Sequence, residues 1–545
     1  MVRLCWVLIC CVVAAGTTAS AQDGRAVDAL TRDAIQLPRA SERATNSVPI
    51  QTQETIDTSV EAQASVQVGA VQITGLSQLL QGDFSDIAEG YAGRTLDQTG
   101  LKDLARAVAD RARDRGYIFA SAAIPAQDME IGIVRVKLDE GIIDEVRLQG
   151  SENSRVRYLL LGLAGSAVRK EDIERWLLLA DDIPGITVER TRFLRENGRG
   201  ILVVDVSTDA ARGTVRLDNS GPNAFGPVRA RLEVELNGLI DADDQLVTFT
   251  QVTPFQPREL TFVSGRYTNI VSKGGLQIGI SGGAGRTRDR DTTSARVSKG
   301  RSRYAAASLT TPVLRSNDAS LWVSTEFGYL DVDQNFSGGF RRNDEIVTAT
   351  LSSWSNIKTG RGQLQAGVSI TQGLGILGAT GSNDPSASRI DGSGRFTKGN
   401  FWANWNGKLG SGYALRIAAN GQVSSRPLLS SQEIGFGGPN YGRGYDFSER
   451  FGDQGIMGLA ELRRGFENPA NFFDWAQLYG FIDGGYIDNL GDGFGGGTLV
   501  SGGGGLRTGL KGVELGIEIA QPINAARFEA GDRSPKVNFS IGYSF

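Results

Sequence analysis

Apolar and polar side chains alternate strictly along many stretches in the second part of this sequence. In residues 228–237, five apolar residues alternate with five polar ones, and four of the polar residues are charged. Residues 535–545, which end the chain, alternate in the same way. Successive side chains of a β-strand point to opposite faces, so each stretch predicts a strand with one apolar face and one polar face.

About sixteen such stretches follow one another, in a part of the chain that holds 55 of the 72 glycines. They begin near residues 213, 227, 244, 258, 274, 301, 318, 342, 361, 394, 411, 455, 475, 498, 512 and 535. Strands with one wholly apolar face fit a closed barrel that has lipid outside and water inside. We therefore predict a transmembrane β-barrel of about 16 antiparallel strands over residues 210–545. Aromatic residues near strand ends predict interfacial girdles; they include Trp322, Phe327, Tyr329, Trp402, Trp405 and Tyr479. A soluble all-β repeat protein is the alternative.

The N-terminus has the features of a secretory signal. Arg3 precedes the apolar stretch 4–15, which is too short to span a membrane, and Ala19 to Ala21 form an A-x-A cleavage site. We expect residues 1–21 to be removed. Residues 22–65 then contain a short amphipathic helix at 25–37, followed by a flexible polar linker.

Residues 66–209 contain one unit twice. The pattern V-x-I-x-G at residues 71–75 recurs as V-x-L-x-G at residues 146–150. Each copy continues with helical periodicity and closes with alternating strands, which predicts the order β-α-α-β-β in residues 66–142 and again in residues 143–209. We expect each copy to form a small α+β domain, with a three-stranded sheet under two helices.

A sheet this small leaves an exposed edge, which can take up an extended peptide as an added strand. Val134, Val136 and Leu138 alternate with charged residues near the end of the first unit. We predict these three residues as a partner-binding strand. An edge that is only protected by its charges is the alternative.

Composition excludes several kinds of chemistry. The sequence has no histidine, so Ser-His-Asp and Cys-His catalysis and histidine metal sites are excluded. All three cysteines lie within residues 1–21, so the mature chain has no thiol. With 57 basic and 61 acidic residues, the net charge gives no sign of nucleic-acid binding. We therefore expect a protein that is not an enzyme and has no metal, no cofactor and no nucleic-acid partner.

Two motifs lie in the predicted barrel. The connection 425–454, between the eleventh and twelfth strands, is unusually long and contains Arg443-Gly444-Tyr445. The thirteenth strand contains Phe481-x-Asp483-x-Gly485. Period two places these three residues on one face, which we predict to be the lumen face. Shorter motifs occur at residues 139–141 (Asp-Glu-Gly) and 217–221 (Leu-Asp-Asn-Ser-Gly).

These motifs and the order of the segments resemble the TpsB-type two-partner secretion transporters, a branch of the outer-membrane assembly-factor superfamily. The resemblance implies that residues 66–142 and 143–209 are POTRA domains. It also implies that the long loop folds into the barrel and that Arg443 pairs with Asp483, with Glu461 joining the network. A guanidinium is a planar fork suited to carboxylates, and its burial is costly without them.

The resemblance further implies a transporter of the Gram-negative outer membrane, with its POTRA domains in the periplasm. It would secrete one large partner protein, whose unfolded N-terminal secretion domain enters the transporter first. Some members of the family also activate the haemolysin or adhesin that they secrete. The helix at residues 25–37 would plug the resting pore. The terminal Phe545 would serve as a barrel-insertion signal, read by the barrel-assembly machinery on the way into outer-membrane lipid. An outer-membrane barrel-assembly factor is the alternative.

Overall fold

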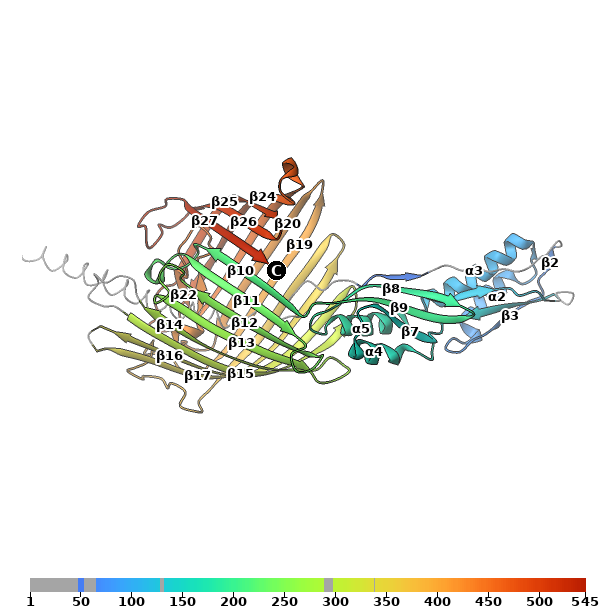
Figure 1. Cartoon of the computed structure of the whole chain (residues 1–545), viewed down its shortest axis with the longest axis horizontal. Coiled ribbons are helices and arrows are strands. Elements are labelled where there is room, and N and C mark those ends of the chain that lie inside the picture. Colours follow the sequence, from blue (N-terminus) through green and yellow to red (C-terminus); the bar gives the residue numbers. More distant parts are fainter. Residues whose placement is uncertain (1–47, 53–64, 128–131, 289–297, 338) are drawn as a thin grey trace, which may run out of the picture. The chain divides into compact units, whose positions relative to one another are not determined.

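The computed structural model describes residues 48–52, 65–127, 132–288, 298–337 and 339–545 (Figure 1). The predicted signal peptide 1–21 and helix 25–37 lie outside the described residues. The described chain forms two compact units, which divide near residue 210. Within the described ranges, no helix is long and apolar enough to cross a membrane.

The first module of the smaller unit follows the predicted order β-α-α-β-β. Its main elements are β3 (Ala70–Thr74), α2 (Ser85–Tyr91), α3 (Gln98–Asp114), β5 (Ser121–Ala123) and β6 (Ile133–Asp139), and short strands β2 (Val66–Gln67) and β4 (Thr95–Leu96) form a separate pair. Asp97 starts α3 as an N-cap, its Oδ1 accepting from the Gly100 amide at 2.8 Å. The apolar face of α3 covers the sheet, in a core that includes Leu104, Val108 and Phe84.

The sheet of this first module has the order β3-β6-β5. Strand β6 is therefore central, with both of its edges paired. Val134, Val136 and Leu138 lie on β6 and are almost completely buried in the core. The prediction of these residues as a partner-binding strand is wrong, because a central strand has no free edge. The outer strands of the sheet are β3 and β5.

The second module repeats the order with β7 (Glu145–Gly150), α4 (Ser154–Leu160), α5 (Lys170–Asp181), β8 (Ile186–Glu196) and β9 (Arg199–Thr208). Its sheet has a fourth strand, and the order is β1-β8-β9-β7. Strand β1 (Ile50–Thr52) comes from the stretch predicted as flexible linker and pairs in parallel with β8. The linker thus occupies the edge of the second sheet.

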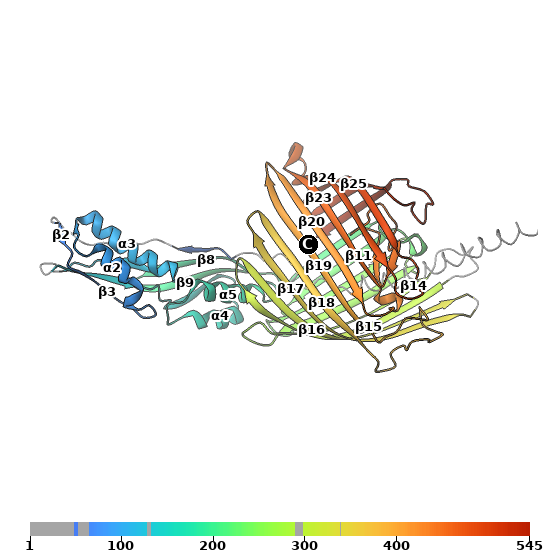
Figure 2. The same ribbon diagram turned by 180° about the vertical axis from the view of Figure 1, so that it is seen from behind.

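The larger unit is a closed barrel of sixteen strands among the described residues, as predicted (Figure 1). Its strands are β10 (Ala211–Asp218), β11 (Arg229–Asn237), β12 (Asp244–Val252), β13 (Leu260–Ile270), β14 (Gln277–Arg288), β15 (Ser298–Arg315), β16 (Ala319–Phe336), β17 (Arg341–Thr359), β18 (Gly362–Leu374), β19 (Thr397–Gly410), β20 (Tyr413–Ser424), β23 (Gln454–Glu467), β24 (Trp475–Asp488), β25 (Gly497–Leu510), β26 (Val513–Pro522) and β27 (Lys536–Ser544). Each begins within three residues of its predicted start. Strand β27 pairs with β10 and closes the barrel. Figure 2 shows the opposite wall, which includes β16 to β20.

Alternation assigns the two faces of the wall. On β24, Ile482 and Tyr486 are exposed on the lipid side, whereas Phe481 and Asp483 are buried on the lumen side. Tyr479 shares the lumen face of β24. Trp322 is buried on β16, where its ring stacks on that of Trp354 with 6.1 Å between the ring centroids. Neither Tyr479 nor Trp322 is a girdle residue, contrary to the sequence prediction, because each lies on the lumen face of its strand.

Candidate functional site in the barrel lumen

The connection between β20 and β23 folds back as a hairpin. Strands β21 (Ile434–Phe436) and β22 (Arg450–Gly452) form its stem. Its tip carries Tyr445, which is completely buried in a cluster with Phe436, Met457, Ile487 and Leu499. Because Met457, Ile487 and Leu499 belong to β23, β24 and β25, this packing holds the tip against the inner wall.

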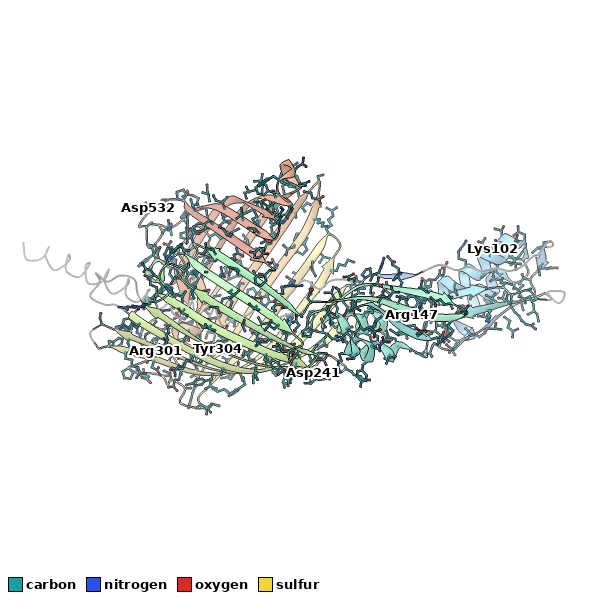
Figure 3. The ribbon with its side chains drawn as sticks, viewed as in Figure 1. Lys102, Arg147, Asp241, Arg301, Tyr304 and Asp532 are labelled. Atoms are coloured by element: carbon teal, nitrogen blue, oxygen red, sulfur yellow. The ribbon has the colours of Figure 1, made fainter. Side chains whose placement is uncertain are left out.

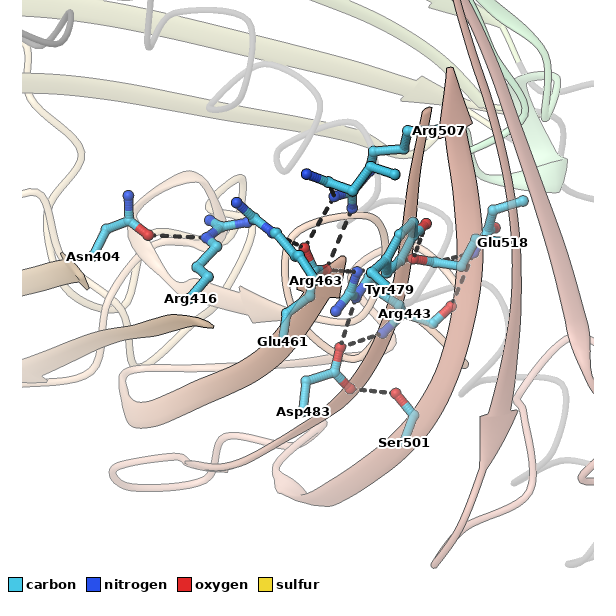
Figure 4. A network of polar contacts seen from close by, with 12 residues as sticks. Asn404, Arg416, Arg443, Glu461, Arg463, Tyr479, Asp483, Ser501, Arg507 and Glu518 are labelled. Atoms are coloured by element: carbon cyan, nitrogen blue, oxygen red, sulfur yellow. Dashed lines mark hydrogen bonds and ion pairs between the residues drawn. The ribbon is translucent and has the colours of Figure 1, made fainter. Parts of the chain in front are cut away.

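Arg443, at the tip, contacts three carboxylates. Its Nη1 donates to Glu461 Oε2 and to Glu518 Oε2, both at 2.8 Å, and its Nε lies 3.3 Å from Asp483 Oδ2 (Figure 4). The guanidinium carbon also lies 3.4 Å from the centroid of the Phe481 ring, a cation–π contact. An ion this deeply buried is stable only when charge partners and hydrogen bonds surround it.

Two further arginines bind one of these carboxylates. Arg463 and Arg507 both donate to Glu461, with shortest distances of 2.7 and 3.0 Å. The network around Arg443 therefore joins three guanidinium groups to three carboxylates, and the charges balance. Arg416 lies opposite Glu461 in the β20–β23 ladder and donates to Asn404 Oδ1 at 2.9 Å (Figure 4).

Gly444 and Tyr445 attach the backbone of the tip. The Gly444 amide donates to Ser501 Oγ at 3.1 Å, and Ser501 in turn donates to Asp483. A Cβ at Gly444 would lie 2.9 Å from both Ser501 Cβ and the Pro522 nitrogen, so only glycine fits there. The Tyr445 hydroxyl donates to the Val500 carbonyl at 3.0 Å.

The tip contacts at least one polar residue on each of five consecutive strands. These residues are Glu461 on β23, Asp483 on β24, Ser501 on β25, Glu518 on β26 and Asn538 on β27. On β27, Lys536 also donates to the Tyr445 carbonyl at 2.9 Å. The structure thus brings together Arg443, Gly444, Asp483 and Glu461, as the resemblance implied. Gly485 lies on the lumen face of β24 but contacts Met457 on the neighbouring strand rather than Arg443.

Sequence reasoning missed Glu518, Ser501, Arg507 and Asn538. Each lies on the polar face of an alternating strand, which was the available signal. Alternation gives the face on which a side chain lies but not the register between neighbouring strands. It therefore could not distinguish these residues from the other residues that face the lumen.

Phe545 lies at the seam that closes the barrel. Its amide donates to the Gly213 carbonyl at 3.0 Å, and the Gly213 amide donates back at 2.8 Å. The Phe545 ring is largely exposed. In the described part of the chain, no three acidic, cysteine or histidine residues group in a way that could hold a metal ion.

Comparison with known proteins decides the family. Residues 198–508, more than half of the chain, match the model of the haemolysin secretion/activation proteins ShlB/FhaC/HecB. The chain belongs to this family. Residues 66–141 also match the ShlB-type POTRA domain. The ShlB/FhaC/HecB match makes the protein an outer-membrane transporter that secretes a partner protein, and not an enzyme.

Individual relatives are distant. The heme/hemopexin transporter protein HuxB of Haemophilus influenzae (strain 86-028NP) is 22% identical over 403 residues, covering 71% of this chain and 70% of HuxB. The outer membrane transporter CdiB of Dickeya dadantii is 22% identical over 446 residues, covering 75% and 74%.

The fold is also similar to solved structures. CdiB from Escherichia coli superposes with a TM-score of 0.72 at 17% identity, over 97% of this chain and 98% of that one. BamA from Haemophilus ducreyi lacking POTRA domains 1–3 gives a TM-score of 0.51 at 14% identity, over 88% and 100%.

Proposed function

We propose that this transporter secretes one specific large partner protein, which enters as an unfolded chain led by its N-terminal segment. The periplasmic modules capture that segment as an added β-strand and deliver it to the barrel. The tip around Arg443 holds the lumen in its resting state and must shift to let the chain pass. Folding of the partner outside the cell draws the chain outward, without nucleotide hydrolysis.

The observation that carries the capture step is the pairing of β1 with β8. Ile50, Gln51 and Thr52 lie opposite Thr191, Arg192 and Phe193, and the Thr191 amide donates to the Pro49 carbonyl at 3.1 Å. The β8 edge is therefore able to accept an extended strand. Among the described residues, three residue pairs hold β1 there, and a longer incoming strand can replace them with more hydrogen bonds.

Three finer steps belong to the same proposal. The helix at residues 25–37 plugs the resting pore and leaves with the linker. Phe545 directs the chain to the barrel-assembly machinery for its own insertion into outer-membrane lipid. The partner is a secreted protein such as a haemolysin or adhesin, which the transporter also activates. Deleting residues 25–37 should raise ion conductance in planar bilayers, whereas unchanged conductance would contradict the plug.

The first experiment is deletion of the gene, followed by comparison of the culture medium and the outer membrane. We expect one large protein to disappear from the medium while other outer-membrane barrels stay at normal levels. A general fall in those barrels, with an unchanged medium, would instead favour a barrel-assembly role.

The capture step has a separate test. A photo-crosslinking residue at Arg192, opposite Gln51 on the β8 edge, should trap the N-terminal segment of the partner during secretion. The matched control places the same residue at Tyr158, an exposed position on α4 in the same module. Replacing Ile50–Thr52 by glycines should increase crosslinking at residue 192. Equal crosslinking at 192 and 158 would contradict strand addition at this edge.

A further inference from the structure

We propose that the outer surface of strands β14 and β15 binds the phosphorylated saccharide headgroup of a glycolipid in the outer leaflet of the outer membrane. The site is a cationic surface formed by Arg286 and Arg288 of β14 and Lys299, Arg301 and Arg303 of β15. Arg258, from the neighbouring connection between β12 and β13, lines the same open groove of about 840 Å³. We call these six residues the cationic patch.

The patch faces lipid rather than the lumen. On β15, Arg301 and Arg303 share their face with Leu309 and Val313, which are about half exposed on the outer wall. On β14, Arg286 likewise shares its face with the exposed Ile280. The pairing of β14 with β15 runs without a register shift, so alternation holds along both strands. Figure 3 labels Arg301 on this wall of the barrel.

The pairing sets like charges directly opposite each other. Arg286 lies opposite Arg301, and Arg288 lies opposite Lys299, two positions further along the same face. Like charges at directly opposite positions destabilise a sheet. Two such pairs in succession lower the stability of the sheet when no anion is bound, and together they make a site for an anion that carries more than one charge.

Few of the described residues around the patch are acidic. Among the described residues that line the groove, none is Asp or Glu. Asp331 and Asp333 occupy the outward face of the adjacent strand β16, and Asp333 forms an ion pair with Arg341. The described cations of the patch thus outnumber the nearby carboxylates.

The height of the patch on the wall identifies the kind of anion. Outward residues from Ala305 to Val313 carry no charge, and they extend over about 27 Å along the strand at about 3.4 Å per residue. With a tilt of about 40° this gives a band of about 21 Å, close to the apolar height of an outer-membrane barrel. Arg303, Arg301 and Lys299 begin where the band ends.

This end of the wall faces the cell surface. Strand β10 enters the barrel directly after the periplasmic modules, so Ala211 marks the periplasmic end and Asp218 the opposite end. Strand β15 runs in the reverse direction, and its first residues lie at the surface end. The patch is therefore level with outer-leaflet headgroups, where arginine forks bind phosphate oxygens in pairs. A phosphorylated glycolipid supplies both the anion and the acyl chains that cover the apolar band.

Thermal unfolding of the purified full chain in detergent tests the proposal. Lipopolysaccharide should raise the melting temperature by several degrees, dephosphorylated lipopolysaccharide by much less, and inorganic phosphate at equal phosphate concentration not at all. The double variant Arg286→Gln/Arg301→Gln should lose most of the shift. Without added lipid it should melt no lower than the natural chain, because a like-charge pair has been removed.

The control is the double variant Arg361→Gln/Lys408→Gln, which removes two exposed cations at the periplasmic end of the wall. It should keep the full shift with lipopolysaccharide. Equal loss in both double variants would mean unspecific charge attraction and would overturn the site. A full shift with inorganic phosphate alone would overturn the glycolipid as its ligand, as would an unchanged shift in Arg286→Gln/Arg301→Gln.

Discussion

Arg443 contacts Asp483 twice, through its backbone amide at 3.2 Å and through its side-chain Nε at 3.3 Å, and both donors share the oxygen Oδ2. The carboxylate thus holds the backbone of the loop tip as well as its charge. A substitution at either residue therefore affects the position of the loop, and not only one ion pair.

Arg443→Ala should reduce secretion at least tenfold per inserted transporter. The variant leaves Glu461, Asp483 and Glu518 with fewer cations, and breaking a buried pair in this way costs about 3–5 kcal/mol. Asp483→Ala should have a smaller effect, and Asp483→Asn the smallest, because an amide oxygen can still accept from the Arg443 amide. The measurement is the amount of partner in the medium, normalised to heat-modifiable barrel in the membrane.

Arg426→Ala is the matched control, because Arg426 lies in the same connection with an exposed side chain. It should secrete normally. Normal secretion by Arg443→Ala would show that the tip has no part in transport.

Gly444→Ala should displace the tip although every charge remains. The added Cβ would meet Ser501 Cβ and the Pro522 nitrogen at 2.9 Å, closer than such contacts occur. We expect reduced secretion and increased conductance in planar bilayers. Gly465→Ala is the control, since a Cβ there meets nothing within 4 Å. If both variants behave like the natural chain, the tip tolerates displacement.

Glu140 fixes a loop of the first module. Its carboxylate accepts from the amides of Ser77, Gln78 and Leu79 at 2.8–3.0 Å and from the Ser77 hydroxyl. Burial would raise the pKa of Glu140, but these hydrogen bonds outweigh it and lower the pKa. Glu140 therefore stabilises the folded module fully at pH values above its unfolded-state pKa of about 4.3. This contribution is lost as the pH falls through the lower pKa that Glu140 has in the folded state.

Glu140→Gln should accelerate hydrogen exchange of the amides at residues 77–79 by roughly tenfold or more at pH 7. The reason is that hydrogen bonds to a charged acceptor each contribute about 1.5–3 kcal/mol. Asp97→Asn, which alters the N-cap of α3 in the same module, should leave these amides unchanged. Unchanged exchange in Glu140→Gln would contradict the assignment.

Burial raises the pKa of Asp181, at the end of α5, to about 6, although the Val188 amide donates to it at 2.8 Å. The folded state therefore binds a proton before the unfolded state does, and this group favours folding increasingly as the pH falls from 7 through 6 toward 4. Asp181→Asn should stabilise the second module at pH 7 by on the order of 1–3 kcal/mol and by less at pH 5.

Pulse proteolysis of the intact transporter in urea, at pH 7 and pH 5, measures this difference. Glu171→Gln, an exposed change in the first turn of the same helix, should not stabilise the module, because it removes a favourable charge near the helix N-terminus. An increase in the free energy of unfolding that is equal at both pH values would show that the titration of Asp181 is not its source.

Alternation alone was enough to predict the barrel strands, because lipid outside and water inside impose period two on every strand. The same rule, applied strand by strand, would have placed Tyr479 with Asp483 in the lumen. The girdle prediction failed for Trp322 and Tyr479 because it used nearness to a strand end and ignored the face, whereas Phe327 is exposed on the outward face of β16.

Strand order within a sheet was harder to predict. Val134, Val136 and Leu138 have the pattern of an edge strand, yet β3 and β5 flank them on both sides. Strand β1 could not be predicted either, since three residues in a polar stretch carry no periodicity and pair only because the β8 edge is available. Predicting Glu518 as a partner of Arg443 would have required the pairing register of β26, which is determined only in the folded barrel.

The contacts that the tip of the long loop makes with five strands also have a mechanical consequence. Residues 461, 483, 501, 518 and 538 lie on five neighbouring strands, so a force on Arg443 is divided among all of them and among the ladders between them. The tip therefore links the wall from β23 to β27 in addition to the ladders within it. At its far edge, the ladder between β27 and β10 has five residue pairs and, next to them, the bonded pair Gly213 and Phe545, compared with fourteen pairs between β23 and β24. The seam where the chain's last strand meets its first barrel strand therefore has fewer residue pairs to resist a force on the tip than any ladder within this wall.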